Sequence, residues 1–189
     1  RKVCGDALEM RGGIGYIEEF ATARLLRDAH LGSIWEGTGN IVAIDALKRA
    51  VGRHGADAAL AADLHARLDD SANVPQPWRN RLSDLVDRAI GFAREVAARS
   101  DNEGDARRAT SLLYHVASAV ALAWEGGRIH EMRGDARRLL LSRMVIRHGV
   151  SPGDPFQLTE SPAQRAITGH LLGERAIGMT EVGELLITA

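Results

Sequence analysis

The chain has 189 residues, which is enough for one or two hydrophobic cores, and 45% of them are hydrophobic, as in an ordinary globular protein. Aromatic residues make up only 4%, and this scarcity, together with abundant alanine and leucine, argues against a β-sandwich and favours an all-α fold. The formal net charge of −1 gives no overall basic excess that would indicate nucleic-acid binding, and no segment approaches the roughly 18 apolar residues needed to span a membrane.

The first predicted helix runs to about Arg11, with Val3, Ala7 and Met10 at helical spacing. The chain begins inside this pattern, with neither an initiator Met nor a signal peptide, so we expect a fragment of a longer protein. Cys4 is the single cysteine, which excludes an intrachain disulfide and fits a reducing compartment such as the cytoplasm. We predict that Cys4 is buried and unreactive.

The glycine pair at residues 12–13 ends this helix. A second amphipathic helix is predicted over residues 18–29, and residues 30–40 form a glycine-rich loop. Thr38 can cap the helix that follows. One face of that helix carries Ile41, Ile44, Leu47 and Val51.

A second helical region begins near residue 57, where Leu60, Leu64 and Leu68 repeat at four-residue spacing. Residues 69–77 contain two prolines and small polar side chains, which predict a linker or turn. Apolar residues at steps of three or four then predict helices over 78–99, 105–132, 136–147 and 161–173. Short loops between helices favour antiparallel neighbours and therefore a bundle.

Two local features refine these helices. Along residues 105–132 the predicted buried stripe carries Leu113, Ala117, Val120 and Trp124. Ser161 followed by Pro162 predicts an N-cap and a first helical residue, whereas the tail from residue 174 fits either a helix or an extended segment. We place the main boundary between residues 52 and 77. This predicts a first segment at residues 1–52, a connecting helix and linker at 53–77, and an appended helical domain at 78–189.

The residues that point to chemistry lie between 12 and 41. The motif GGIGY (12–16) is followed by RLLRD (24–28) and then by IWEGTGNI (34–41). Separately, each has an ordinary structural explanation, such as a helix C-cap for the glycine pair or a solvated turn for Glu-Gly-Thr. In this order and spacing they resemble the acyl-CoA dehydrogenase family over residues 4–49. The resemblance implies that residues 1–52 form the C-terminal part of that family's helical bundle.

The same resemblance implies roles for the residues of the loop. Glu36 matches the glutamate that serves in much of the family as general base, removing the α-proton of an acyl-CoA thioester while the β-hydrogen leaves as hydride to the flavin. Gly37 would let the substrate approach closely. Trp35 would either line the acyl or flavin pocket or anchor the loop in the core.

Four further residues match positions that contact FAD. Gly12 and Gly13 match glycines whose backbone lies against the FAD of a neighbouring subunit in the family's dimer. Thr38 and Asn40 match positions near the FAD diphosphate or adenine at a helix N-terminus, where the helix dipole and free N–H groups favour an anion. The family often has glutamine where this chain has Asn40, and the shorter side chain puts this contact in question.

Beyond the loop the family pattern stops, because its members typically end soon after the next helix. The long extension and the sequence WEGTGN resemble the alkylation-response, AidB-like branch, whose additional C-terminal helical domain has been linked to DNA binding. Residues 76–149 contain thirteen arginines and nine acidic residues, so either salt-dependent DNA binding or a solvated helix face is consistent with them. The candidates for a positive face are Arg79, Arg81, Arg88, Arg107, Arg108, Arg137, Arg138, Arg143 and Arg147.

Other charged and ligating residues fit structural roles. Arg27 and Asp28 are interpreted as a structural ion pair. His115, His130 and His148 lack the i, i+4 spacing that places two metal ligands on one helix face, so no metal site is predicted.

The resemblance therefore implies FAD-dependent α,β-dehydrogenation of an acyl-CoA by the intact cytoplasmic protein, as a homodimer or homotetramer, with the fragment alone inactive. The residues do not specify the acyl chain or the electron acceptor. The alternative is a DNA-binding or oligomerisation module with little dehydrogenase activity.

Overall fold

The computed structural model describes residues 1–35, 37–151, 156 and 161–187. Every regular element within these residues is helical, which confirms the predicted all-α class. By contacts between Cα atoms the chain divides into two compact units, Arg1–Asp45 and Ala46–Ala189.

The first unit consists of short helices. They are α1 (Lys2–Met10), α2 (Gly13–Tyr16), α3 (Ala21–Leu31) and α4 (Gly39–Asp45). Helix α1 packs against α2 and α3. A Cβ added to Gly15 in α2 would lie 2.2 Å from the carbonyl oxygen of Leu8, so this packing requires glycine. The sequence predicted no helix between the glycine pair and residue 18, and the structure forms the helical turn α2 there.

Little of the first unit is buried. Helix α1 has no buried residue, and Cys4 is half-buried rather than buried as predicted, because α1 is covered only by the two short helices beside it. Met10 and Tyr16 are 90% and 79% exposed. The unit therefore presents much of its apolar surface.

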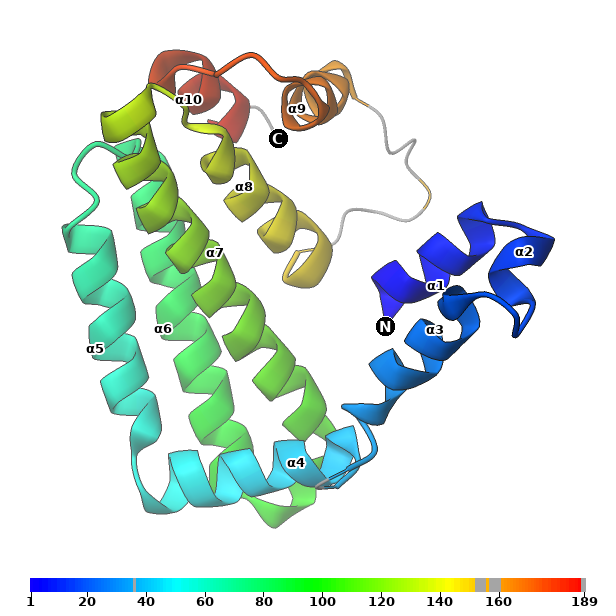
Figure 1. Ribbon diagram of the computed structural model, residues 1–189. Coiled ribbons are helices and arrows are strands. Elements are labelled where there is room, and N and C mark those ends of the chain that lie inside the picture. Colours follow the sequence, from blue (N-terminus) through cyan, green and yellow to red (C-terminus); the bar gives the residue numbers. More distant parts are fainter. Residues whose placement is uncertain (36, 152–155, 157–160, 188–189) are drawn as a thin grey trace. The chain divides into compact units, whose positions relative to one another are not determined.

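The second unit is built on three long helices, α5 (Ala56–Asp69), α6 (Gln76–Ala98) and α7 (Ala106–Arg133), which lie side by side in Figure 1. Its other elements are the π-helical η1 (Ala46–Arg53), the 3-10 helix η2 (Ser100–Asp105), α8 (Arg137–Gly149), α9 (Pro162–Leu172) and α10 (Met179–Ile187). Helix α8 packs along α7. The sequence predicted a connecting helix and a linker at residues 53–77, and the helix that the structure forms there, α5, packs against both α6 and α7.

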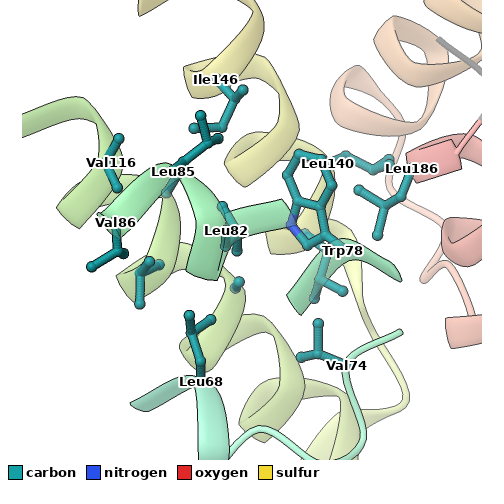
Figure 2. Close-up of a cluster of buried hydrophobic side chains, with 14 of the residues drawn as sticks. Leu68, Val74, Trp78, Leu82, Leu85, Val86, Val116, Leu140, Ile146 and Leu186 are labelled. Atoms are coloured by element: carbon teal, nitrogen blue, oxygen red, sulfur yellow. The ribbon is translucent and has the colours of Figure 1, made fainter. Parts of the chain in front are cut away.

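The core of the second unit includes Trp78 in α6, which is 2% exposed. Figure 2 shows it among apolar side chains that include Leu82 and Leu140. Its indole N–H donates to Ser142 Oγ at 3.2 Å, and the Ser142 hydroxyl donates to the Ala119 carbonyl at 2.7 Å. One buried serine therefore links α6, α7 and α8.

The buried face of α7 differs from the predicted stripe. Of the four predicted residues only Val120 is buried. The buried positions of this region include Val116, Ala119, Val120, Ala123, Gly126 and Gly127. These small residues allow close approach, because a Cβ on Gly126 would lie 2.3 Å from Leu139 Cδ1 in α8. The face is set by the neighbouring helices rather than by the largest side chains.

The last two helices complete the second unit. Ser161 caps α9 as predicted, since its side chain accepts the Gln164 N–H at 3.2 Å. The ambiguous tail forms α10, whose Val182 and Leu186 are buried in the core. Among the described residues, no helix is both long and apolar enough to span a membrane.

Candidate functional site

The predicted catalytic loop lies between α3 and α4. Helix α3 ends at Leu31, whose carbonyl accepts the Trp35 N–H at 3.2 Å. Helix α4 begins at Gly39. Glu36 itself lies outside the described residues, but the residues on both sides of it lie in turns rather than in a helix.

Gly37 has a backbone conformation that side-chain-bearing residues rarely adopt, with φ of 112°. A Cβ there would lie 3.5 Å from Ile41 Cγ2, an ordinary contact. The backbone turn, rather than lack of space, therefore explains the glycine beside residue 36. Trp35 is 63% exposed, so the described part of the chain does not bury it as a core anchor.

The glycine pair lies at the junction of α1 and α2. Gly12 has φ of 58° and ψ of −141°, and its N–H donates to the Glu9 carbonyl at 2.9 Å at the end of α1. Both Gly12 and Gly13 are exposed, and a Cβ on either would have no atom within 4 Å. Only Gly12 has a backbone conformation that favours glycine. Gly13 has no such requirement, and the absence of a side chain there leaves its backbone accessible.

Thr38 and Asn40 lie at the start of α4. The Thr38 carbonyl accepts the Val42 N–H at 3.0 Å, which places Thr38 at the N-cap position, where the carbonyl already belongs to the helix. Both side chains are exposed. Backbone N–H groups in the first turn of a helix have no partner within the helix.

The charged residues of α3 form ion pairs, but not the predicted one. The Arg27 guanidinium donates to both carboxylate oxygens of Glu18, at 2.5 and 3.0 Å. This hydrogen-bonded cation lowers the pKa of Glu18. Asp28 instead lies 4.0 Å from Arg24, one turn earlier. The prediction of an Arg27–Asp28 pair is therefore wrong, since adjacent residues point to different sides of a helix.

The candidate positive face of the second unit is partly neutralised. Several of its arginines pair with nearby acids: Arg88 with Asp84, Arg108 with Asp105, Arg137 with Asp135, and Arg138 with Glu125. Such pairs contribute little to stability, but each places a negative charge beside the positive charge of an arginine. No group of three potential metal ligands occurs in the part of the chain that the structure describes.

A pocket of about 730 Å³ opens between α6, α7 and the end of α8. Its lining includes Leu85, Phe92 and Val116 together with the charged Glu95 and Arg108. The Arg108 guanidinium stacks 4.8 Å from the Phe92 ring centroid. The sequence did not indicate this pocket, because its residues come from helices that are distant along the chain.

The sequence of the first unit has known relatives. Residues 1–52 match the family described as "Acyl-CoA dehydrogenase, C-terminal domain". Over 43 residues, 23% of this chain, it is 51% identical to the putative acyl-CoA dehydrogenase AidB of Escherichia coli and 42% identical to a butyryl-CoA dehydrogenase of Syntrophomonas wolfei. These alignments cover 8% and 7% of the two relatives.

A third relative extends the similarity beyond the first unit. Acyl-CoA dehydrogenase family member 11 of Caenorhabditis elegans is 24% identical over 134 residues, which are 69% of this chain and 21% of that protein. An alignment of this length exceeds the first unit, so it includes part of the second. No solved structure matches the chain significantly. The chain thus spans a small part of each relative, and its residues 1–52 are similar to the C-terminal domain of acyl-CoA dehydrogenases.

Proposed function

We propose that the intact protein is an FAD-dependent acyl-CoA dehydrogenase of the AidB-like branch, with Glu36 as general base, and that this chain alone is inactive. The observation that carries the proposal is the family match of residues 1–52, which contain the Glu-Gly-Thr loop. Its structural support is that the described residues on both sides of position 36 lie between α3 and α4 rather than within a helix. We also propose that the intact protein acts in the cytoplasm as a homodimer or homotetramer.

In the proposed reaction, the Glu36 carboxylate takes the α-proton of the thioester, and the C–H electron pair forms the α,β double bond as the β-hydrogen leaves with its own pair. Bound FAD supplies the hydride acceptor. Exclusion of water strengthens a carboxylate as a base. The φ of 112° at Gly37 turns the chain immediately after the base, and the exposed Trp35 offers an indole surface for the pocket wall.

The residues proposed to contact FAD fit an extended, anionic cofactor. The open backbone at Gly12 and Gly13, with no atom near either Cβ position, allows a dinucleotide to lie against the chain. Thr38 and Asn40 are exposed at the first turn of α4, where N–H groups can donate to phosphate oxygens. In this proposal Thr38 serves both as N-cap and as a cofactor contact.

The test is Glu36→Gln in the full-length protein. We expect the variant to keep its flavin, judged by the bound flavin spectrum, but to lose bleaching of that spectrum on addition of acyl-CoA, by about 100-fold or more in rate, because the amide cannot accept the proton. Glu19→Gln, at an exposed carboxylate of the same unit, is the matched control and should bleach like the wild type.

The second candidate, a DNA-binding or oligomerisation module, rests on the arginine surplus of residues 76–149. Four of these arginines pair with acids of the same region, so they are less available to a phosphate backbone. If the wild type never bleaches with acyl-CoA thioesters of any chain length, and DNA retention falls steeply with salt, the dehydrogenase proposal is overturned in favour of this one.

A further inference from the structure

Arg143 in α8 is an exception among the buried polar residues of the second unit. It is 4% exposed, and its Nη1 has no hydrogen-bond partner among the described residues. The other buried polar residues have partners: Asp57 pairs with Arg94 at 2.5 Å, Ser71 donates to a main-chain carbonyl at 2.6 Å, and Ser142 bonds to two helices. A buried guanidinium nitrogen without a partner is costly, because it gives up hydration without compensation.

Two more arginines lie beside it. Arg147 follows Arg143 by one helical turn and therefore lies on the same face of α8. Arg81 comes from α6, where its guanidinium stacks 5.5 Å from the Trp78 ring centroid. The Trp78 indole in turn donates to Ser142, the residue before Arg143. We call Arg81, Arg143 and Arg147 the arginine cluster.

The charges of the cluster act on one another. Burial lowers the pKa of Arg143, and the nearby guanidiniums of Arg147 and Arg81 lower it further. Within the described residues, no acid forms an ion pair with any of the three. The same two helices hold four arginines that do pair with an acid: Arg88, Arg94, Arg137 and Arg138. Packing thus holds three like charges close together against their mutual repulsion.

A guanidinium presents a planar set of N–H donors that matches the oxygens of a phosphate or carboxylate. A site with three such groups favours a doubly charged anion over a singly charged one, since the Coulomb attraction rises with ligand charge. We propose that Arg81, Arg143 and Arg147 form a binding site for the dianionic phosphate group of a small phosphorylated molecule, with Arg143 as its buried anchor. All three residues belong to the second unit, and the proposal does not depend on the proposed function.

The test is titration of the full chain with inorganic phosphate near neutral pH, at constant ionic strength, followed by calorimetry and by the thermal unfolding midpoint. Phosphate should bind saturably and raise the midpoint, because a ligand that binds only the folded state stabilises it. Acetate and chloride should do neither. Arg143→Met should reduce phosphate affinity at least tenfold, and Arg143→Lys should also weaken it, because an ammonium lacks the planar set of donors.

Matched variants separate this role from a structural one. Without phosphate, Arg143→Met should unfold at the same or a higher temperature, because an apolar side chain of similar length replaces an unpaired buried charge. Arg81→Met and Arg147→Met should weaken phosphate binding, whereas Arg133→Met, at an exposed arginine of α7, should leave it unchanged.

Several outcomes would overturn the proposal. If phosphate and acetate bind equally well and raise the unfolding midpoint equally, no site specific for a dianion exists. A lower unfolding temperature of Arg143→Met, with no phosphate effect in the wild type, would show that a group of the chain itself neutralises Arg143. Binding of a DNA oligonucleotide that requires the cluster, without binding of inorganic phosphate, would assign the arginines to a polymer backbone instead.

Discussion

Ser142 is the residue through which three helices of the second unit share hydrogen bonds. It is fully buried, and its hydroxyl both accepts the Trp78 indole N–H and donates to the Ala119 carbonyl. A hydroxyl is the smallest side-chain group that can do both. The position therefore selects for serine through its hydrogen bonds rather than through its volume.

We predict that Ser142→Ala lowers the free energy of unfolding by about 1–3 kcal/mol, because it leaves the Trp78 indole N–H buried without an acceptor. Urea denaturation followed by tryptophan fluorescence and circular dichroism measures this loss. Ser118→Ala is the control: the Ser118 hydroxyl donates only to the Tyr114 carbonyl of its own helix, so the loss there should stay within about 0.5 kcal/mol. Equal losses in the two variants would contradict the proposed role of Ser142.

A second residue-scale network surrounds Trp124 on the surface of α7. Its indole N–H donates to the Asp70 carboxylate at 2.9 Å, and the Arg128 guanidinium donates to the same carboxylate oxygen at 2.5 Å. The indole N–H and the Arg128 guanidinium, as hydrogen-bond donors, both lower the pKa of Asp70. Arg67 and Arg128 also stack on the indole, at 5.0 and 4.6 Å from its ring centroid. Trp124 therefore joins α5 to α7 at the edge of the core.

At the scale of elements, the close contact between α7 and α8 depends on a glycine in α7. Gly126 is buried in the middle of a long helix, where glycine costs helix stability relative to alanine. Its advantage is proximity, since a Cβ there would lie 2.3 Å from Leu139 Cδ1 and 3.1 Å from the Leu139 backbone nitrogen. The helices are close because of this residue.

We predict that Gly126→Ala destabilises the second unit by about 1–3 kcal/mol, since the new methyl group forces α8 or Leu139 to move. Gly91→Ala in α6 is the matched control. Its Cβ would have no atom within 4 Å, so it should stabilise the fold by roughly 0.5–1 kcal/mol through helix propensity alone. Thermal and urea unfolding of the two variants measure both effects, and a stabilising Gly126→Ala would contradict this account of the contact.

The sequence predicted the long helices well because a buried helix leaves a regular apolar spacing. It did not predict η1, where the His54 N–H donates to the Arg49 carbonyl five residues earlier, at 3.1 Å. Apolar residues at 41, 44, 47 and 51 fit an α-helix and a π-helical continuation equally. The spacing also did not identify the buried face of α7, where small residues packed against neighbouring helices replace large ones.

The candidate site was only partly predictable for a different reason. Glycines in a loop sequence indicate positions that need unusual backbone conformations, and Gly12 and Gly37 do have positive φ. The conformation of a glycine does not reveal what lies against it, so the roles in binding FAD stay predictions. Likewise the arginine count indicated a basic region but not that Arg143 is buried, because its burial depends on residues from other helices.

At the scale of the whole molecule, the two units differ in how much they bury. All members of the hydrophobic core cluster, from Leu64 to Leu186, belong to the second unit. In the first unit the described buried residues are Gly15, Ala23 and Ala43, all of which are small. Because apolar burial is the main term that offsets chain entropy, the second unit should carry most of the stability of the chain.

We therefore predict that residues 46–189, expressed alone, unfold cooperatively on heating, with a midpoint within about 4 °C of that of the full chain, a shift that corresponds to roughly 1 kcal/mol for a domain of this size. Residues 1–45 alone should show no cooperative transition and little stable helix, because isolated helices shorter than about 12–15 residues are marginal in water. Circular dichroism at 222 nm against temperature measures all three proteins. A sharp transition in residues 1–45 would mean that the first unit has a source of stability other than apolar burial, and noncooperative melting of residues 46–189 would mean that its core needs the first unit to fold.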